Sequence, residues 1–205
     1  RYFLAGGLCA AFSHGVTTPI DVVKTKIQAS PEVYKRGMLD ATSKIVRSEG
    51  FSFLLTGLAA TVVGYGIEGA LKFGFYEMFK GVFAAVTASP FVAFLLASVV
   101  AGAVASLGLC PMEDARIRMV GDKDYAKDNL LQAMARIVHR HGLRSAFSGL
   151  GAMLAKQIPY TMAKQVSFDM FAARISKLVE ARGADPASFA FYITTAAAMC
   201  ASVLA

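Results

Sequence analysis

A carboxylate and a basic side chain stand three residues apart behind a proline at two places in this 205-residue chain. The block occurs first at position 19 and again 92 residues later at position 111. The two copies are Pro19-Ile20-Asp21-Val22-Val23-Lys24 and Pro111-Met112-Glu113-Asp114-Ala115-Arg116. An acid and a base at i and i+3 share nearly one face of a helix, and a proline bends the helix that contains it. The spacing predicts that Asp21 pairs with Arg116 of the other copy, and that Glu113 pairs with a base in a third copy.

Ion pairs of this kind would form a ring that closes one end of a central cavity and breaks when that end opens. A local pair within each block is the alternative, but it does not explain why the proline recurs with the charges. The same shift relates Gly50 to Gly142 and Gly57 to Gly149. We therefore expect one repeat over residues 1–86, a second over 87–183 and the truncated start of a third over 184–205.

A second pattern places charges inside apolar segments at helical spacing. Four residues recur at i+4 on one face of a predicted helix, and the shift of 92 residues gives a matching face on another. The two sets are Gly64, Glu68, Lys72 and Tyr76, and Lys156, Tyr160, Lys164 and Phe168. Ionisable residues at membrane depth normally face a bundle interior or an aqueous cavity. Together the two faces carry three basic residues and one acid, which suits the binding of a small, strongly charged anion, and Lys156 is the foremost candidate ligand. The alternative is that Glu68 and Lys72 only pair with each other.

His14 lies five residues before Pro19 in an otherwise uncharged segment. A histidine can carry a proton near neutral pH, as a proton relay requires. A neutral histidine that hydrogen-bonds to neighbouring backbone explains the residue equally well.

The composition indicates a membrane protein. Hydrophobic residues make up 56% of the chain and charged residues 17%, with a mean hydropathy of +0.52, whereas soluble domains carry about 25% charged residues. Residues 51–67, 81–112 and 186–205 contain no charge at all, and about 20 apolar residues span a bilayer. A large soluble helical core is the alternative, but charge-free runs of this length are rare in soluble helices.

We expect five membrane helices and two short surface helices. The spans are predicted at about 2–29, 52–84, 91–121 and 145–180, with a truncated fifth after a turn at 183–186. The surface helices are predicted at about 38–48 and 128–140, stopped by Gly50 and Gly142. The connections that contain these surface helices are the basic ones, so the positive-inside rule places both on the inner side of the membrane.

Other classes of protein fit poorly. The three cysteines are scattered and form no CxxC pair, so neither a disulfide framework nor a zinc site is expected. No basic stripe with interleaved aromatic residues supports nucleic-acid binding. No nucleophile–base constellation or phosphate-cradling glycine loop points to an enzyme, and we expect no cofactor.

The proline blocks resemble those of the mitochondrial carrier family, whose pattern is P-x-[DE]-x-x-[KR] in three repeats of about a hundred residues. The acid-glycine element downstream appears as Glu49-Gly50, and a glutamine follows the first base at Gln28. The family's second gate, [FY]-[DE]-x-x-[KR], is similar to Tyr76-Glu77-Met78-Phe79-Lys80. Within the family, the segments 72–77 and 156–164, together with His14 and Pro19, resemble the members that transport phosphate.

The resemblance implies an all-α membrane bundle of parallel repeats in the mitochondrial inner membrane, with five of six transmembrane helices present and short surface helices on the matrix side. It implies a monomer that moves inorganic phosphate with a proton or in exchange for hydroxide, and cardiolipin bound near Gly57 and Gly149. It assigns a matrix gate to Pro19, Asp21, Lys24, Gln28, Pro111, Glu113 and Arg116. It assigns a cytoplasmic gate to Tyr76, Glu77, Lys80, Phe168 and Asp169. Substrate binding falls to Gly64, Glu68, Lys72, Lys156, Gln157, Tyr160 and Lys164, and proton coupling to His14, Glu68 and Glu113.

The chain departs from the phosphate-transporting members at several positions. Gly102 stands where they usually have a membrane-embedded glutamate, and Lys156 stands where they have arginine. Glu68 stands where they often have glutamine, and we hypothesise that it takes over the proton step together with His14. The leading interpretation is a phosphate carrier that lacks most of its third repeat. The alternatives are a carrier for another small anion and a non-transporting membrane scaffold on the same fold.

Overall fold

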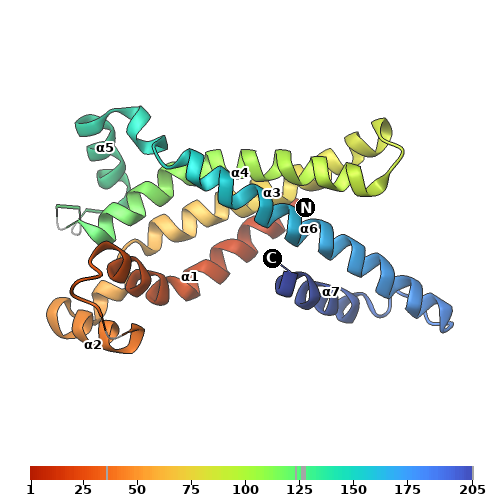
Figure 1. The fold of residues 1–205 in the computed structure, drawn as a ribbon, viewed down its shortest axis with the longest axis horizontal. Helices are drawn as coiled ribbons and strands as arrows, with labels where there is room; N and C mark the ends of the chain where they lie inside the picture. The colour runs from red at the N-terminus through yellow and green to blue at the C-terminus, as the bar shows by residue number, and fades with distance from the viewer. Residues whose placement is uncertain (36, 123, 126–127, 205) are drawn as a thin grey trace. The chain divides into compact units, whose positions relative to one another are not determined.

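The computed structural model describes residues 1–35, 37–122, 124–125 and 128–204, and among these residues it contains helices and turns but no strand. The predicted all-α architecture is confirmed. A long helix, a surface helix, a short 3₁₀ helix and a second long helix follow one another twice, and a further helix begins (Figure 1). The elements are α1 (Tyr2–Ala29), α2 (Met38–Glu49), η1 (Phe51–Leu55), α3 (Leu58–Val86), α4 (Pro90–Gly121), α5 (Leu130–His141), η2 (Leu143–Phe147), α6 (Leu150–Ala181) and α7 (Ala190–Leu204).

The second and fourth spans begin later than we predicted. Residues 52–84 and 145–180 were each expected to form one helix, but a 3₁₀ helix precedes each of them and a short turn separates the two parts. In the first case the turn contains Gly57 at φ 78°, a left-handed conformation that costs glycine little and other residues more. The apolar residues Phe51 to Leu55 hid this break, because hydrophobicity alone does not distinguish the end of a surface element from the start of a span.

The surface helices begin and end where local chemistry predicts. Asn129 caps α5 by accepting a hydrogen bond from the backbone N–H of Gln132, whose side chain accepts from the backbone N–H of Asn129. This reciprocal capping box satisfies two otherwise unpaired donors. Gly50 and Gly142 end α2 and α5 with φ 88° and 77°, as expected for glycine after a helix.

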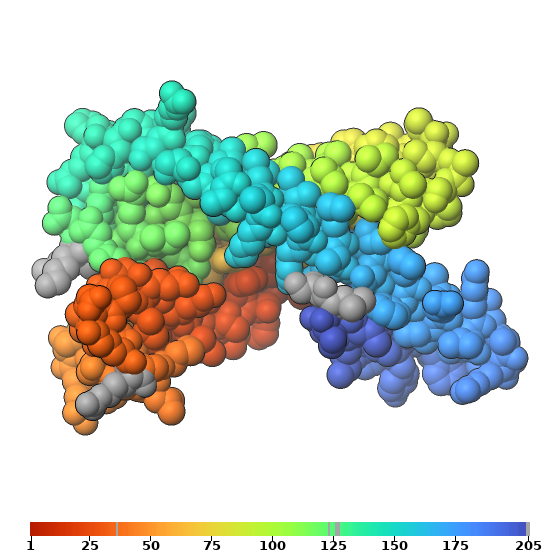
Figure 2. All heavy atoms as spheres, viewed as in Figure 1, coloured from red at the N-terminus to blue at the C-terminus, as the bar shows by residue number. Residues whose placement is uncertain are grey.

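The chain forms two compact units, one from residues 1–71 and 105–151 and one from 72–104 and 152–205. In the first unit, α2 buries Ala41 and Ile45 against Val23 of α1 and Leu54 of η1, and the side chains of α1 (red) and α2 (orange) pack together in Figure 2. The second repeat builds the same kind of cluster from α5, η2 and the end of α4. In the second unit, Tyr76 packs on α4 with three phenylalanines of its own helix around it.

Three described helices are long and apolar enough to cross a membrane: α1, the stretch from Phe51 to Val86, and α4. The expected fourth span, α6, is equally long but interrupts its apolar residues with charges, and α7 has 15 residues. On α1, large apolar side chains recur at i+4 and stand exposed, namely Leu4, Leu8, Phe12, Val16 and Ile20. An apolar stripe of this length is typical of a helix that faces lipid or another helix.

Candidate functional site

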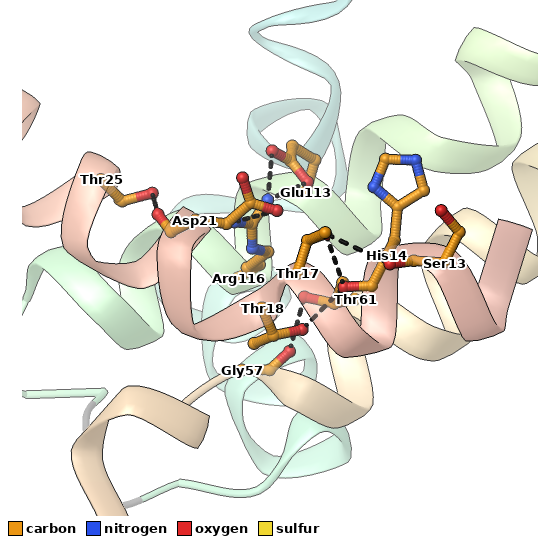
Figure 3. A network of polar contacts seen from close by, with 10 residues as sticks. All are labelled: Ser13, His14, Thr17, Thr18, Asp21, Thr25, Gly57, Thr61, Glu113 and Arg116. Atoms are coloured by element: carbon orange, nitrogen blue, oxygen red, sulfur yellow. Dashed lines mark hydrogen bonds and ion pairs between the residues drawn. The ribbon is translucent and has the colours of Figure 1, made fainter. Parts of the chain in front are cut away.

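Arg116 is the centre of a buried ion-pair network in the first unit. Its side chain, on α4, is 4% exposed and donates a hydrogen bond from one terminal nitrogen to Glu113 Oε1 at 3.0 Å. The other terminal nitrogen lies 3.5 Å from Asp21 Oδ2 on α1. Figure 3 shows both carboxylates pointing toward the guanidinium group. The predicted pair between Asp21 and Arg116 is therefore present, and the local pair within the second block is present beside it.

The surrounding backbone makes room for this buried cation. Gly57 lies against it: a Cβ atom at that position would approach the Arg116 Cγ atom to 3.3 Å. Nearby hydroxyl groups bond to their own helices, with Thr25 donating to the carbonyl of Asp21 and Thr61 to that of Gly57 (Figure 3). A buried arginine with two carboxylates within reach fixes α1 against α4, because a charge in a low-dielectric interior is costly unless it is paired.

The other residues assigned to this network lie at its margin. Lys24 and Gln28 are exposed on α1, and no ion pair of Lys24 occurs among residues 1–35, 37–122, 124–125 and 128–204. Both α1 and α4 continue as helices through Pro19 and Pro111, which are half-buried. Glu113, expected to pair with a base in a third copy, bonds to Arg116 of its own block.

Sequence reasoning missed the ion pair that joins α1 to α2 in the first repeat. Lys26 Nζ lies 3.0 Å from Glu49 Oε1 and 4.6 Å from the centre of the Phe53 ring. This contact ties α1 to the end of α2. The acid-glycine element was recognised at Glu49-Gly50, but nothing in the spacing of 23 residues identified Lys26 as the partner.

Asp169 is the centre of a second network, which lies within the second unit. Its Oδ2 atom accepts hydrogen bonds from the Tyr76 hydroxyl at 2.7 Å and from Lys80 Nζ at 3.2 Å. Lys80 also donates to Glu77 at 2.9 Å and stands over the rings of Tyr76 and Phe94. Four of the five residues assigned to the second gate therefore meet here, while Phe168 is half-buried on α6 beside them.

Two lysines and a tyrosine of the predicted anion site also meet in the second unit. Lys164 Nζ donates to the Tyr160 hydroxyl at 3.1 Å and lies 5.4 Å from its ring centre. Lys72 Nζ, from α3, lies 5.6 Å from the same ring centre. One aromatic ring thus has two ammonium groups beside it, an arrangement stabilised by cation–π attraction. Lys156 is exposed on the same helix as Lys164, and Gln157 is buried.

The remaining predicted site residues belong to the first unit. Gly64 packs closely on α4, where a Cβ atom would approach that of Met112 to 2.7 Å. Glu68 is 4% exposed. The His14 ring stacks on the Tyr65 ring with centres 3.7 Å apart and planes 10° apart. No grouping of histidine, cysteine and acidic residues able to hold a metal ion occurs in the described part of the chain.

Tandem repeats of long helices with paired charges among them define a multi-pass helical membrane protein built from parallel repeats. The profile of the mitochondrial carrier protein family matches residues 1–86 and again residues 87–178. The chain belongs to the mitochondrial carrier family, whose members are multi-pass transporters of the mitochondrial inner membrane and not enzymes.

Individual relatives agree with this assignment. The chain is similar to mitochondrial substrate carrier family protein N of Dictyostelium discoideum, with 38% identity over 188 residues, which cover 89% of this chain and 62% of that protein. It is similar to solute carrier family 25 member 3 of Bos taurus, with 32% identity over 87% of this chain and 52% of that protein. It is also 32% identical to a probable mitochondrial phosphate carrier protein of Schizosaccharomyces pombe, over 81% of this chain and 55% of that protein. The chain spans between half and two thirds of the length of these relatives.

Proposed function

We propose that the protein moves inorganic phosphate across the mitochondrial inner membrane, together with a proton or in exchange for hydroxide. The observation that carries this proposal is the cluster of Lys72, Tyr160 and Lys164. Two ammonium groups and a phenol offer hydrogen-bond donors to one small anion. Tyr160 and Lys164 are exposed, so they are accessible to a solute. The name of the Schizosaccharomyces pombe relative supports phosphate as that solute.

The two ion-pair networks support transport by alternating access. Each joins charges from different repeats, Asp21 to Arg116 in one and Lys80 to Asp169 in the other. Pairs of this kind can break and re-form as helices separate, which suits gates on the matrix and cytoplasmic sides. In this proposal the repeats meet at residues 86/87 and 183/184, and the two networks, which both join the first repeat to the second, open in turn.

Specificity for a different small anion is the second candidate. Both cations beside Tyr160 are lysines, and the next cation along α6 toward its start is Lys156. A lysine acts as a point charge, whereas an arginine fork holds phosphate through two parallel bonds. Uptake of labelled phosphate in competition with sulfate, arsenate and dicarboxylates separates the two candidates. A competitor that displaces phosphate at equal concentration would favour the second.

Loss of a lysine at this cluster should reduce uptake strongly. In the full-length protein reconstituted into liposomes, we expect Lys164→Ala, at the cluster, and Lys156→Ala, two turns earlier on α6, each to lower phosphate uptake tenfold or more. A lost charge-assisted hydrogen bond contributes about 1.5–3 kcal/mol, and about 1.4 kcal/mol corresponds to a factor of ten. Lys177→Ala, at an exposed position of the same helix, is the control and should leave uptake unchanged. Wild-type uptake in both lysine variants would contradict the proposed site.

Proton coupling is proposed to depend on Glu68 and His14. Glu68 is a buried acid on the apolar helix α3, and His14 stacks on Tyr65 of the same helix. In liposomes with an imposed pH gradient, Glu68→Gln should keep exchange of phosphate for phosphate but lose acceleration by the gradient. Glu180→Gln, at an exposed position of α6, should respond like the wild type. A full response in Glu68→Gln would show that Glu68 is only structural.

A further inference from the structure

A stripe of polar residues lies buried on α6, next to the exposed stripe that contains Tyr160 and Lys164. Its members recur at i+4, so they share one face of the helix. They are Gln157, Thr161, Gln165 and Asp169. Thr161 is 1% exposed and Gln165 is 5% exposed. A buried face of a membrane helix made of amides and hydroxyls needs hydrogen-bond partners for each of them.

Two contacts fix which part of α4 this stripe faces. A Cβ atom on Gly102 would lie 3.4 Å from Thr161 Oγ1 and 3.6 Å from the Ile158 Cα atom. Two turns earlier on α4, the Phe94 ring meets Lys80, which is bonded to Asp169. These contacts indicate that the two helices run antiparallel, and we expect Ser98, one turn from Gly102, to lie near the level of Gln165.

Three polar atoms at the middle of this contact between α4 and α6 have no hydrogen-bond partner among the residues that the structure describes. They are Thr161 Oγ1 and the two polar atoms of the Gln165 side chain, all of them buried. The hydroxyl of Ser98 donates instead to the carbonyl of Leu95 on its own helix at 2.7 Å. Leaving a hydroxyl and an amide unpaired in a low-dielectric interior is strongly unfavourable, so another hydrogen-bonding group must reach them.

We propose that the seam formed by Gly102, Thr161 and Gln165 is a binding site for ordered water between α4 and α6. Water both donates and accepts, as the hydroxyl and the amide together require, and buried waters in proteins bind such groups. Gly102 brings the backbone of α4 close to this point: an added Cβ atom would lie 3.4 Å from Thr161 Oγ1 and 3.6 Å from the Ile158 Cα atom. A methyl group at position 102 would therefore stand against the Thr161 hydroxyl and shield it from water.

The position of this site gives it a role in helix movement. Gln165 stands one helical turn from Asp169, which holds the Tyr76 and Lys80 side chains. If α4 and α6 separate as the Asp169 network opens, bound water keeps the hydroxyl and the amide hydrogen-bonded throughout. This inference does not depend on which anion the protein carries.

X-ray hydroxyl-radical labelling of the purified full-length protein tests the site, because radicals formed from bound water oxidise the residues next to it. We expect labelling of Ile158 and Met162 in the wild type, and at least a threefold loss in Gly102→Ala, whose methyl group would shield the Thr161 hydroxyl from water. Gly102→Ser adds a carbon of the same size with a hydroxyl that can bond to Thr161, so it controls for bulk. Absent labelling in the wild type, or unchanged labelling in Gly102→Ala, would overturn the proposal.

Thermal unfolding provides an independent test of the water site. If water serves Thr161, the isosteric variant Thr161→Val loses a hydrogen bond and should unfold at a lower temperature than the wild type. Gly102→Ser should unfold at a higher temperature than Gly102→Ala, because its hydroxyl can bond to Thr161. If the seam is dry, removing an unpaired hydroxyl is neutral or stabilising. A midpoint for Thr161→Val equal to or above that of the wild type would therefore contradict the water site.

Discussion

Gly69→Ala should destabilise the protein strongly, because α1 and α3 touch backbone to backbone at this point. A Cβ atom on Gly69 would lie 2.5 Å from the carbonyl oxygen of Gly6 and 2.5 Å from the Ala10 Cβ atom. Neither neighbour can move aside without moving α1. Overpacking a close-packed contact costs about 1–3 kcal/mol and occasionally more, so we expect a loss at or above the top of that range, measured by thermal unfolding in detergent.

Gly81→Ala on the same helix is the matched control. In the part of the chain that the structure describes, no atom outside the local helix lies within 4 Å of a Cβ atom placed on Gly81. Alanine in a helix is more favourable than glycine by about 0.5–1 kcal/mol, so this variant should be slightly more stable than the wild type. Equal midpoints for the two variants would show that α1 and α3 are not held in close contact at Gly69.

The repeat and its charges allowed much of the fold and part of the site to be predicted from the sequence. A shift of 92 residues identified the paired blocks, and charge-free runs located the long helices. The ion pair of Asp21 with Arg116 could be predicted because an acid and a base at fixed positions in a repeat have few other partners. The second gate was recognised as a set of residues, but the hydrogen bond from Tyr76 to Asp169 depends on how α3 packs against α6, which the spacing does not contain.

What the sequence did not reveal depends on packing between distant segments. The i+4 pattern identified the stripe of Tyr160 and Lys164 because its members are charged or aromatic. The neighbouring stripe of Thr161 and Gln165 consists of uncharged polar residues, which are common on any helix surface, and only its burial distinguishes it. The stacking of His14 on Tyr65 was also missed, because the periodicity of a local segment does not reveal an aromatic partner 51 positions away.

Reversing the charge of Arg116 should have the second large effect. Breaking a buried ion pair by changing one partner costs about 3–5 kcal/mol, because the remaining charges are left uncompensated. In Arg116→Glu three carboxylates would crowd together, and in Asp21→Lys two cations would. We expect both variants to unfold at lower temperatures and to lose most phosphate uptake. Arg140→Glu is the control, because Arg140 forms an exposed pair with Asp124 and such pairs contribute about 0–1 kcal/mol.

Combining the two reversals separates the pair across the repeats from the pair within the block. Asp21→Lys with Arg116→Glu restores an attraction between α1 and α4, so the double variant should be more stable than the sum of the single losses predicts, as coupled residues are. Recovery should be incomplete, because Glu113 now faces a second carboxylate three residues away. Adding Glu113→Gln removes that repulsion and should raise stability and uptake further. If the double and triple variants are no better than Arg116→Glu alone, the contact of Asp21 with Arg116 does not hold α1 to α4.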